Sequence, residues 1–87
     1  MLGVGFVYPS MGQVYLYHPS YERETQSIPI RIREIKTLKD PKLVWNGEKE
    51  FTPSTNGDLR LPIIRGKQSL VLYDGEQQKA FVDFEVK

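Results

Sequence analysis

The chain has 87 residues, which is enough for one domain spanning residues 1–87 and no more. Its 12 Lys and Arg face 11 Asp and Glu with the two signs interleaved, so no basic block exists to track a phosphate backbone, and we expect no nucleic-acid partner. The sequence has no cysteine, which excludes disulfides, thiolate metal sites and a cysteine nucleophile.

Two strands are predicted in the first 17 residues. Residues 1–7 are apolar but short, and Pro9 follows closely, so we expect a first strand there and neither a signal peptide nor a membrane-inserted segment. Residues 13–17 alternate between two sets of side chains, which predicts a second strand. We expect the aliphatic Val14 and Leu16 to face inward, which directs the two tyrosines of this segment outward.

Residues 28–33 predict a third strand, with isoleucines on one face and arginines on the other. Pro29 has no N–H to donate to a ladder, so it belongs at the start of the strand or on an edge. Glu34 breaks the alternation, and Ile35 restores an apolar residue one step late. We expect a β-bulge at residues 33–34 to account for this shift.

A tight hairpin is predicted in the middle of the chain. Trp45 ends a short apolar run and is followed directly by Asn46 and Gly47. Asn-Gly is the strongest short-range signal for a type I′ turn, because both central residues need positive φ. We therefore expect Trp45 to anchor the core beside this turn, and residues 58–62 to form a shorter strand that ends at a proline.

The last two strands form the clearest hairpin in the sequence. Residues 69–73 and 80–86 alternate between apolar and polar positions, and the turn residues 74–77 lie between them. The side chains expected to face inward are Leu70, Leu72, Ala80, Val82, Phe84 and Val86.

These elements predict an all-β domain, an immunoglobulin-like antiparallel β-sandwich of about seven strands. Turn signals recur roughly every 8–12 residues, as such a sandwich requires. Small β-barrels share this pattern, so a barrel stays open as an alternative.

No group of residues has the composition of an active site. His18 is the single histidine, and no nucleophile-elbow spacing surrounds the serines near it. Gly3 and Gly5 form a Gly-x-Gly pair, but no strand precedes them and no helix follows. Several acidic residues occur two apart, which is typical of a solvated strand face. We expect no catalytic residue, no metal ligand and no cofactor, and we expect the domain itself not to be an enzyme.

Four aromatic residues are expected on the outside of the sheets, namely Tyr15, Tyr17, Tyr73 and Phe81. An outward aromatic cluster can contact a partner protein or stack on sugar rings. It can also pack across strands within one sheet, or be covered by a neighbouring domain of a longer protein. Arg31 and Arg33 beside such aromatics would suit single-stranded nucleic acid, but the interleaved acidic residues argue against it.

An ordered set of motifs resembles a known family. The motifs are Pro-Ser-Met-Gly-Gln-Val-Tyr at 9–15, Gln-Ser-Ile-Pro-Ile-Arg at 26–31, Leu-Val-Trp-Asn-Gly at 43–47, Leu-Arg-Leu-Pro at 59–62, a Gly-to-Gly segment at 66–75, and Ala-Phe-Val-Asp-Phe-Glu-Val at 80–86. In this order they resemble the C-terminal β-sandwich domain of bifunctional penicillin-binding proteins of the 1C type. The resemblance covers nearly the whole chain.

The resemblance implies a non-catalytic accessory module of a peptidoglycan synthase that carries glycosyltransferase and transpeptidase domains elsewhere. It implies a location outside the cytoplasmic membrane, periplasmic or at the cell surface. The implied partner is another protein domain, either the transpeptidase domain or an envelope protein. A carbohydrate- or glycan-binding β-sandwich of an extracellular protein is the alternative that the outward aromatics leave open.

Overall fold

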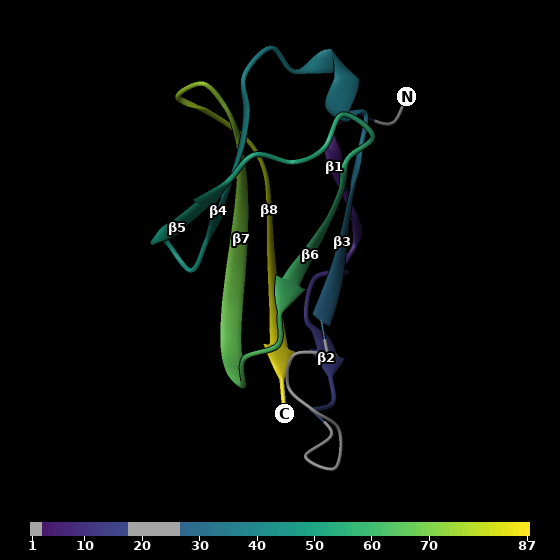
Figure 1. Ribbon diagram of the computed structural model, residues 1–87, viewed down its shortest axis with the longest axis vertical. Helices are drawn as coiled ribbons and strands as arrows, with labels where there is room; N and C mark the ends of the chain where they lie inside the picture. Colours follow the sequence, from purple (N-terminus) through teal and green to yellow (C-terminus); the bar gives the residue numbers. More distant parts are fainter. Residues whose placement is uncertain (1–2, 18–26) are drawn as a thin grey trace.

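The computed structural model describes residues 3–17 and 27–87, which form eight strands in two sheets (Figure 1). The three-stranded sheet has the order β1-β3-β6, with bounds Gly5–Tyr8, Ser27–Arg33 and Asp58–Pro62. The five-stranded sheet has the order β2-β8-β7-β4-β5, with bounds Gln13–Tyr15, Gln77–Val86, Gly66–Asp74, Pro41–Trp45 and Lys49–Phe51. The predicted all-β class is confirmed, with one strand more than the sequence suggested.

Neighbouring strands are antiparallel with one exception. The chain pairs β1 with β3 in the first sheet, then crosses to the second sheet, where β2 runs parallel to β8. The first strand predicted from the apolar N-terminal segment is therefore present as β1. No helix in the described part of the chain is long and apolar enough to cross a membrane.

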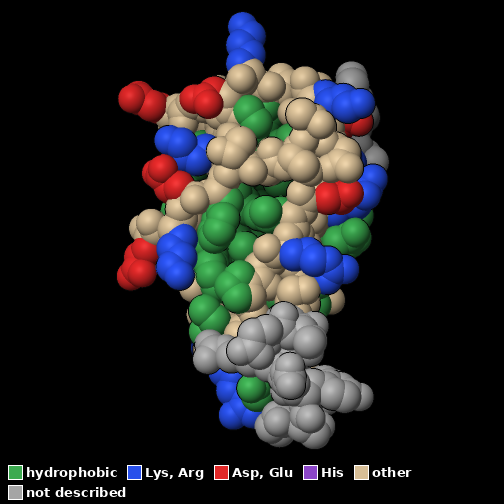
Figure 2. Space-filling view, in the orientation of Figure 1, with side chains coloured by type: hydrophobic (Ala, Val, Ile, Leu, Met, Phe, Trp, Pro, Cys, Tyr) green, Lys and Arg blue, Asp and Glu red, His purple; other side chains and the backbone are tan. Residues whose placement is uncertain are grey.

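The core lies between the two sheets and takes every second residue from the long strands. Its buried apolar side chains are Ile28, Ile30, Ile32, Ile35, Leu43, Trp45, Leu61, Ile63, Leu70, Leu72, Val82, Phe84 and Val86. Figure 2 shows apolar side chains along the middle of one side of the molecule, with Lys, Arg, Asp and Glu on both flanks. The expected inward set of the last hairpin is confirmed, with Ala80 partly buried against the core.

The third strand has the predicted alternation, but its end differs from the prediction. Pro29 lies near the start of β3, beyond the part of the strand that pairs with β1, so its missing N–H interrupts no ladder on that side. No bulge interrupts β3 at residues 33–34. Glu34 instead adopts a left-handed conformation with φ of 62°, and a short 3₁₀ helix, Ile35–Thr37, follows it. This turn, rather than a bulge, returns Ile35 to the core.

Both predicted hairpins are present. At the first, Asn46 and Gly47 have φ of 54° and 71°, and the Glu48 N–H donates to the Trp45 carbonyl at 3.1 Å, as a type I′ turn requires. Strand pairing resumes at Trp45 and Lys49, so Glu48 is one residue more than a two-residue loop needs. At the second, Asp74 pairs with Gln77 across a two-residue turn.

Trp45 is a core residue, as predicted, with 2% of its surface exposed. Its Nε1–H donates to the buried Gln68 Oε1 at 2.8 Å, and the Gln68 amide group in turn donates to the Ile64 carbonyl. Phe51 packs beside the indole with the ring centroids 6.2 Å apart. The indole therefore buries its apolar area without leaving its N–H unpaired.

Candidate functional site

The candidate site is built on the outer face of the five-stranded sheet, the side turned away from the core. Ladder pairs line up its residues in rows: Val44 lies opposite Val71, and Val71 lies opposite Phe81. In the next row Ser69 lies opposite Asp83. Each row alternates with a buried row, because successive side chains of a strand point to opposite faces.

The second strand has the opposite phase to the prediction. Val14 and Leu16 are 48% and 65% exposed, whereas Tyr15 and Tyr17 pack against the core. The cause is the parallel register with β8, in which Val14 lies beside the outward Glu85 and Tyr15 beside the buried Val86. The expectation that Tyr15 and Tyr17 face outward is therefore wrong.

Both of these tyrosines have partners inside or at the rim of the sandwich. The Tyr15 ring meets Phe84 edge-on, with centroids 5.9 Å apart and planes at 88°. Burial raises the pKa of the Tyr15 phenol above its ordinary value, and the nearby Tyr8 adds a smaller contribution in the same direction. The guanidinium of Arg65 lies 4.6 Å from the centroid of the Tyr17 ring, which is cation–π geometry.

Tyr73 and Phe81 lie on the outer face, as predicted. Phe81 is 44% exposed. Tyr73 is half-buried and lines a shallow hollow of about 340 Å³ together with Lys42 and Val44. The structure thus brings two of the four aromatic residues to one outer face and places the other two on the opposite side of the sheet.

An apolar strip replaces the expected aromatic cluster. It consists of Met11, Val14, Leu16 and Phe81, and Met11 and Leu16 are the most exposed large apolar residues described, at 61% and 65%. Met11 and Val14 lie along β8, because the Met11 sulfur is 3.4 Å from the Asp83 nitrogen and Val14 pairs with Glu85. The sequence prediction missed Val14 and Leu16, because their aliphatic side chains were assigned to the core, and it said nothing of the exposure of Met11.

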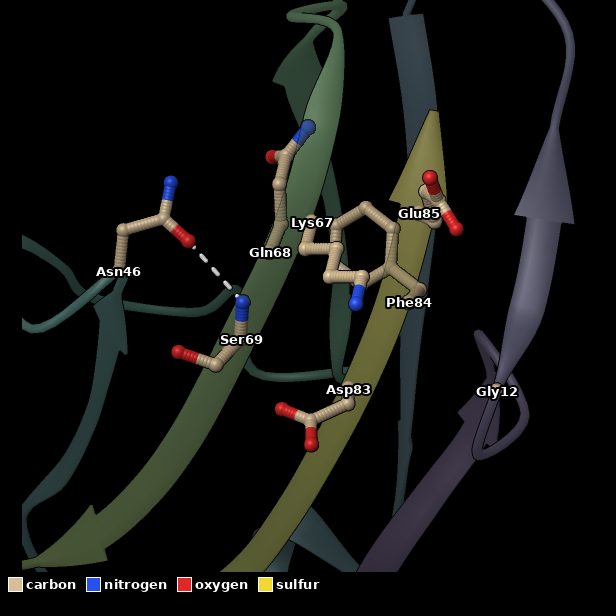
Figure 3. Close-up of a pocket in the computed structure, with 8 residues that line it drawn as sticks. All are labelled: Gly12, Asn46, Lys67, Gln68, Ser69, Asp83, Phe84 and Glu85. Atoms are coloured by element: carbon tan, nitrogen blue, oxygen red, sulfur yellow. Dashed lines mark hydrogen bonds between the residues drawn. The ribbon is translucent and has the colours of Figure 1, made fainter. Parts of the chain in front are cut away.

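A polar hollow of about 510 Å³ opens beside the strip (Figure 3). Lys67, Ser69, Asp83 and Glu85 line it from the two longest strands, and Asn46 and Gly12 line its two sides. The Asn46 Oδ1 accepts the Ser69 N–H at 2.9 Å. The Gly12 N–H donates to the Asp83 carbonyl at 2.8 Å. The remaining carboxylate, ammonium and hydroxyl groups can form hydrogen bonds with a bound molecule.

Clustered metal ligands and buried polar side chains without partners are two further signs of a functional site. Within residues 3–17 and 27–87, no three His, Asp or Glu side chains come together as metal ligands would. His18 lies outside the described residues. Among the buried side-chain nitrogen and oxygen atoms that the structure describes, none lacks a hydrogen-bond partner. Such an orphaned group would have pointed to an absent ligand.

The comparisons with known proteins bear on the fold. No protein-family model matches the chain, and no significant match is found among the curated proteins. A solved structure of the fibronectin(III)-like modules of CbhA from Clostridium thermocellum is similar with a TM-score of 0.64 over 98% of this chain and 96% of that one, at 11% sequence identity. The chain therefore has a fibronectin(III)-like, that is immunoglobulin-like, β-sandwich fold, and the barrel alternative is excluded.

Proposed function

We propose that this chain is a non-catalytic protein-interaction module that docks on a neighbouring protein domain through the outer face of its five-stranded sheet. The observation that carries this proposal is the apolar strip. Four large apolar side chains follow one another along the β2–β8 margin of this face, with 44–65% of their surfaces exposed. Single exposed apolar residues are common, but several along one margin of a sheet, with polar side chains beside them, are typical of an interaction surface.

The surroundings of the strip have the composition of an interface rim. The polar hollow beside it presents both signs of charge, with Lys67 facing Glu85 across the ladder. An interface of this kind buries its apolar centre and keeps charged groups at the wet margin. Phe81 is the natural anchor, because aromatic side chains dominate the energy of interfaces.

We further propose that the parent protein is a peptidoglycan synthase of the penicillin-binding protein 1C type, and that the module works outside the cytoplasmic membrane. The support for this step is the ordered set of motifs in the sequence, from residues 9–15 to residues 80–86. A β-sandwich whose described residues bring no three His, Asp or Glu side chains together as metal ligands would is compatible with an accessory role. The partner would then be the transpeptidase domain or another envelope protein.

The first experiment reads the gene upstream of this chain and then titrates the ¹⁵N-labelled module with the transpeptidase domain encoded there. We expect amide shifts centred on residues 11–16 and 81–85. Leu16→Ser and Phe81→Ser should each weaken binding about tenfold, because the loss of an interface anchor exceeds about 1 kcal/mol and 1.4 kcal/mol is tenfold in affinity.

Val7→Ser is the matched control. Val7 is 45% exposed but belongs to β1 of the other sheet, so its loss should leave binding unchanged. A gene without transpeptidase or glycosyltransferase motifs would remove the penicillin-binding assignment. Binding that is indifferent to Leu16→Ser and Phe81→Ser would remove the docking surface itself.

A glycan-binding role is the second candidate, and the position of Phe81 near the polar hollow favours it. Asp83 and Ser69 offer hydrogen bonds next to an exposed aromatic ring, a combination that suits a sugar. Titration with peptidoglycan fragments in parallel separates the two roles. Shifts with fragments at millimolar concentration, lost in Phe81→Ser and retained in Leu16→Ser, would favour the glycan.

A further inference from the structure

The outer face of the three-stranded sheet differs from the face described above in carrying arginines in consecutive rows. Arg33 pairs with Gly5, Arg31 lies between Tyr8 and Asp58, and Arg60 pairs with Pro29. All of these point away from the core, because Ile28, Ile30 and Ile32 fill the inner side of β3. We call the three arginines the arginine row. Figure 2 shows blue side chains along the flank formed by β3 and β6.

The positive charge of this face is only partly offset. Arg31 forms an ion pair with Asp58 at 3.0 Å, and within the described residues no other carboxylate lies within 4.0 Å of the arginine row. Glu34 and Lys36 follow β3 and carry opposite formal charges. The chain as a whole carries a formal net charge of +1, so the charge of the arginine row is a local concentration.

Each of the three guanidinium groups donates a hydrogen bond to another described residue. Arg31 Nη1 donates to Asp58 Oδ1 at 3.0 Å, and Arg60 Nη1 donates to Ser27 Oγ at 2.8 Å. Arg33 Nε donates to the Gly3 carbonyl at 2.9 Å. A guanidinium has five N–H donors, so these contacts orient the groups and leave further donors for a ligand.

Gly5 makes room for one of the three groups. A Cβ atom at position 5 would lie 2.7 Å from Arg33 Nη2, so the guanidinium lies over the backbone of β1 where any other residue would place a side chain. A hollow of about 410 Å³ opens beside the other two arginines and is lined by Tyr8, Arg31, Asp58 and Arg60 among others.

We propose that the arginine row binds an extended acidic peptide segment of a partner protein, with Asp or Glu at alternate positions. Successive rows are two residues apart along the strand, which is about 7 Å, and an extended peptide repeats its side chains on one face at the same interval. A segment lying along β3 would then place one carboxylate at each arginine. Charge-assisted contacts of this kind are the strong ones, and Arg clusters commonly recognise acidic motifs.

A single-stranded nucleic acid fits this face less well. Nonspecific strand binding relies on several aromatic side chains that stack successive bases, and Tyr8 is the one aromatic residue among those that line the hollow. The proposal is independent of the apolar strip, because the two surfaces belong to different sheets.

The test uses fluorescein-labelled synthetic peptides and fluorescence anisotropy at low ionic strength. One peptide alternates glutamate with threonine, and a second has the same composition with the glutamates in one block. We expect the alternating peptide to bind at least about fivefold more tightly, and Arg33→Gln and Arg60→Gln each to weaken it roughly threefold to tenfold. Lys79→Gln, which removes one exposed charge from the other sheet, should change nothing.

Gly5→Ala tests the geometry without changing the charge. Its methyl group must displace the Arg33 guanidinium, which keeps its charge, so it should weaken the alternating peptide but by less than Arg33→Gln does. Circular dichroism checks that each variant is folded. Equal affinity for the two peptides, no effect of the arginine substitutions, or tighter binding of an oligothymidylate of equal charge would each overturn the proposal.

Discussion

The hydrogen bond between Trp45 and Gln68 offers a quantitative test of how the core is held together. Trp45 Nε1 and Gln68 Oε1 are 2.8 Å apart, and 2% and 5% of the two residues are exposed. Gln68 also donates to the Ile64 carbonyl, so one buried amide serves two partners that strand pairing does not satisfy. Trp45→Phe removes the donor of the first bond, and Gln68→Met removes both bonds while keeping an unbranched chain of similar length.

The expected losses follow from the buried groups left without partners. An unsatisfied buried polar group costs about 1–3 kcal/mol, and Trp45→Phe adds a small loss of packing, so we expect each variant to lower the free energy of unfolding by about 2–4 kcal/mol. A chain of this length has roughly 4–13 kcal/mol of stability in all. Trp45→Ala, at about 3–5 kcal/mol, could consume most of it, which makes the milder substitution the better probe.

Urea unfolding followed by far-ultraviolet circular dichroism measures these losses, because Trp45 is the single tryptophan and its fluorescence disappears in the variant. The double variant should lose about 1 kcal/mol less than the two single losses added together, since the second change removes a partner already unpaired. Lys67→Met, an outward neighbour on β7, should combine with Trp45→Phe additively to within about 0.5 kcal/mol. A coupling below about 0.3 kcal/mol between Trp45 and Gln68 would show that their bond contributes no specific stability.

Gly57→Ala should lower the free energy of unfolding by about 3 kcal/mol or more, because φ is +84° there and an added Cβ would collide with the Ile32 carbonyl. Gly75→Ala, with φ of +63° but open space around it, should cost only about 1 kcal/mol, and equal urea midpoints for the two variants would refute this. Tyr15 ionises less readily in the folded chain than in the unfolded chain, so the unfolded state loses its proton first and the stability falls as the pH rises past about 10. Tyr15→Phe should reduce this fall, and an unchanged slope of unfolding free energy against pH would contradict it.

The strands with one unambiguous apolar set were predicted correctly. In β3 the residues that could face the core were either the isoleucines or the arginines. In β8 they were either the set that includes Val82 and Phe84 or the set that includes Asp83 and Glu85. The large difference in the cost of burying the two sets fixes the phase in such strands. The type I′ turn was also predicted correctly, because few residues other than Asn and Gly accept positive φ at its two central positions.

In β2 the sequence offers two sets that can both be buried. Val14 and Leu16 compete with Tyr15 and Tyr17, and a tyrosine can bury its ring while its hydroxyl stays at the rim. What decides the phase is the register against β8, which is a contact over about 70 residues of sequence. The bulge predicted at the end of β3 was wrong for a related reason. A left-handed Glu34 and a 3₁₀ turn shift the alternation of apolar residues in the same way as a bulge would.

The two proposed surfaces differ in how far the sequence predicts them, because β3 has one apolar set that can be buried whereas β2 has two. Once a sandwich fixes the inward set of a strand, the remaining residues form its outer face, and their chemistry is set by which set the core has taken. The arginine row could be inferred from the sequence of β3 in part, since burial of the isoleucines requires Arg31 and Arg33 to point outward. The contribution of Arg60 and the space above Gly5 required the register with the neighbouring strands. The apolar strip could not be inferred at all, because it exists only if Tyr15 takes the inner side of β2 in place of Val14 and Leu16. With Tyr15 inside, the two aliphatic side chains lie on the outer face that carries Phe81.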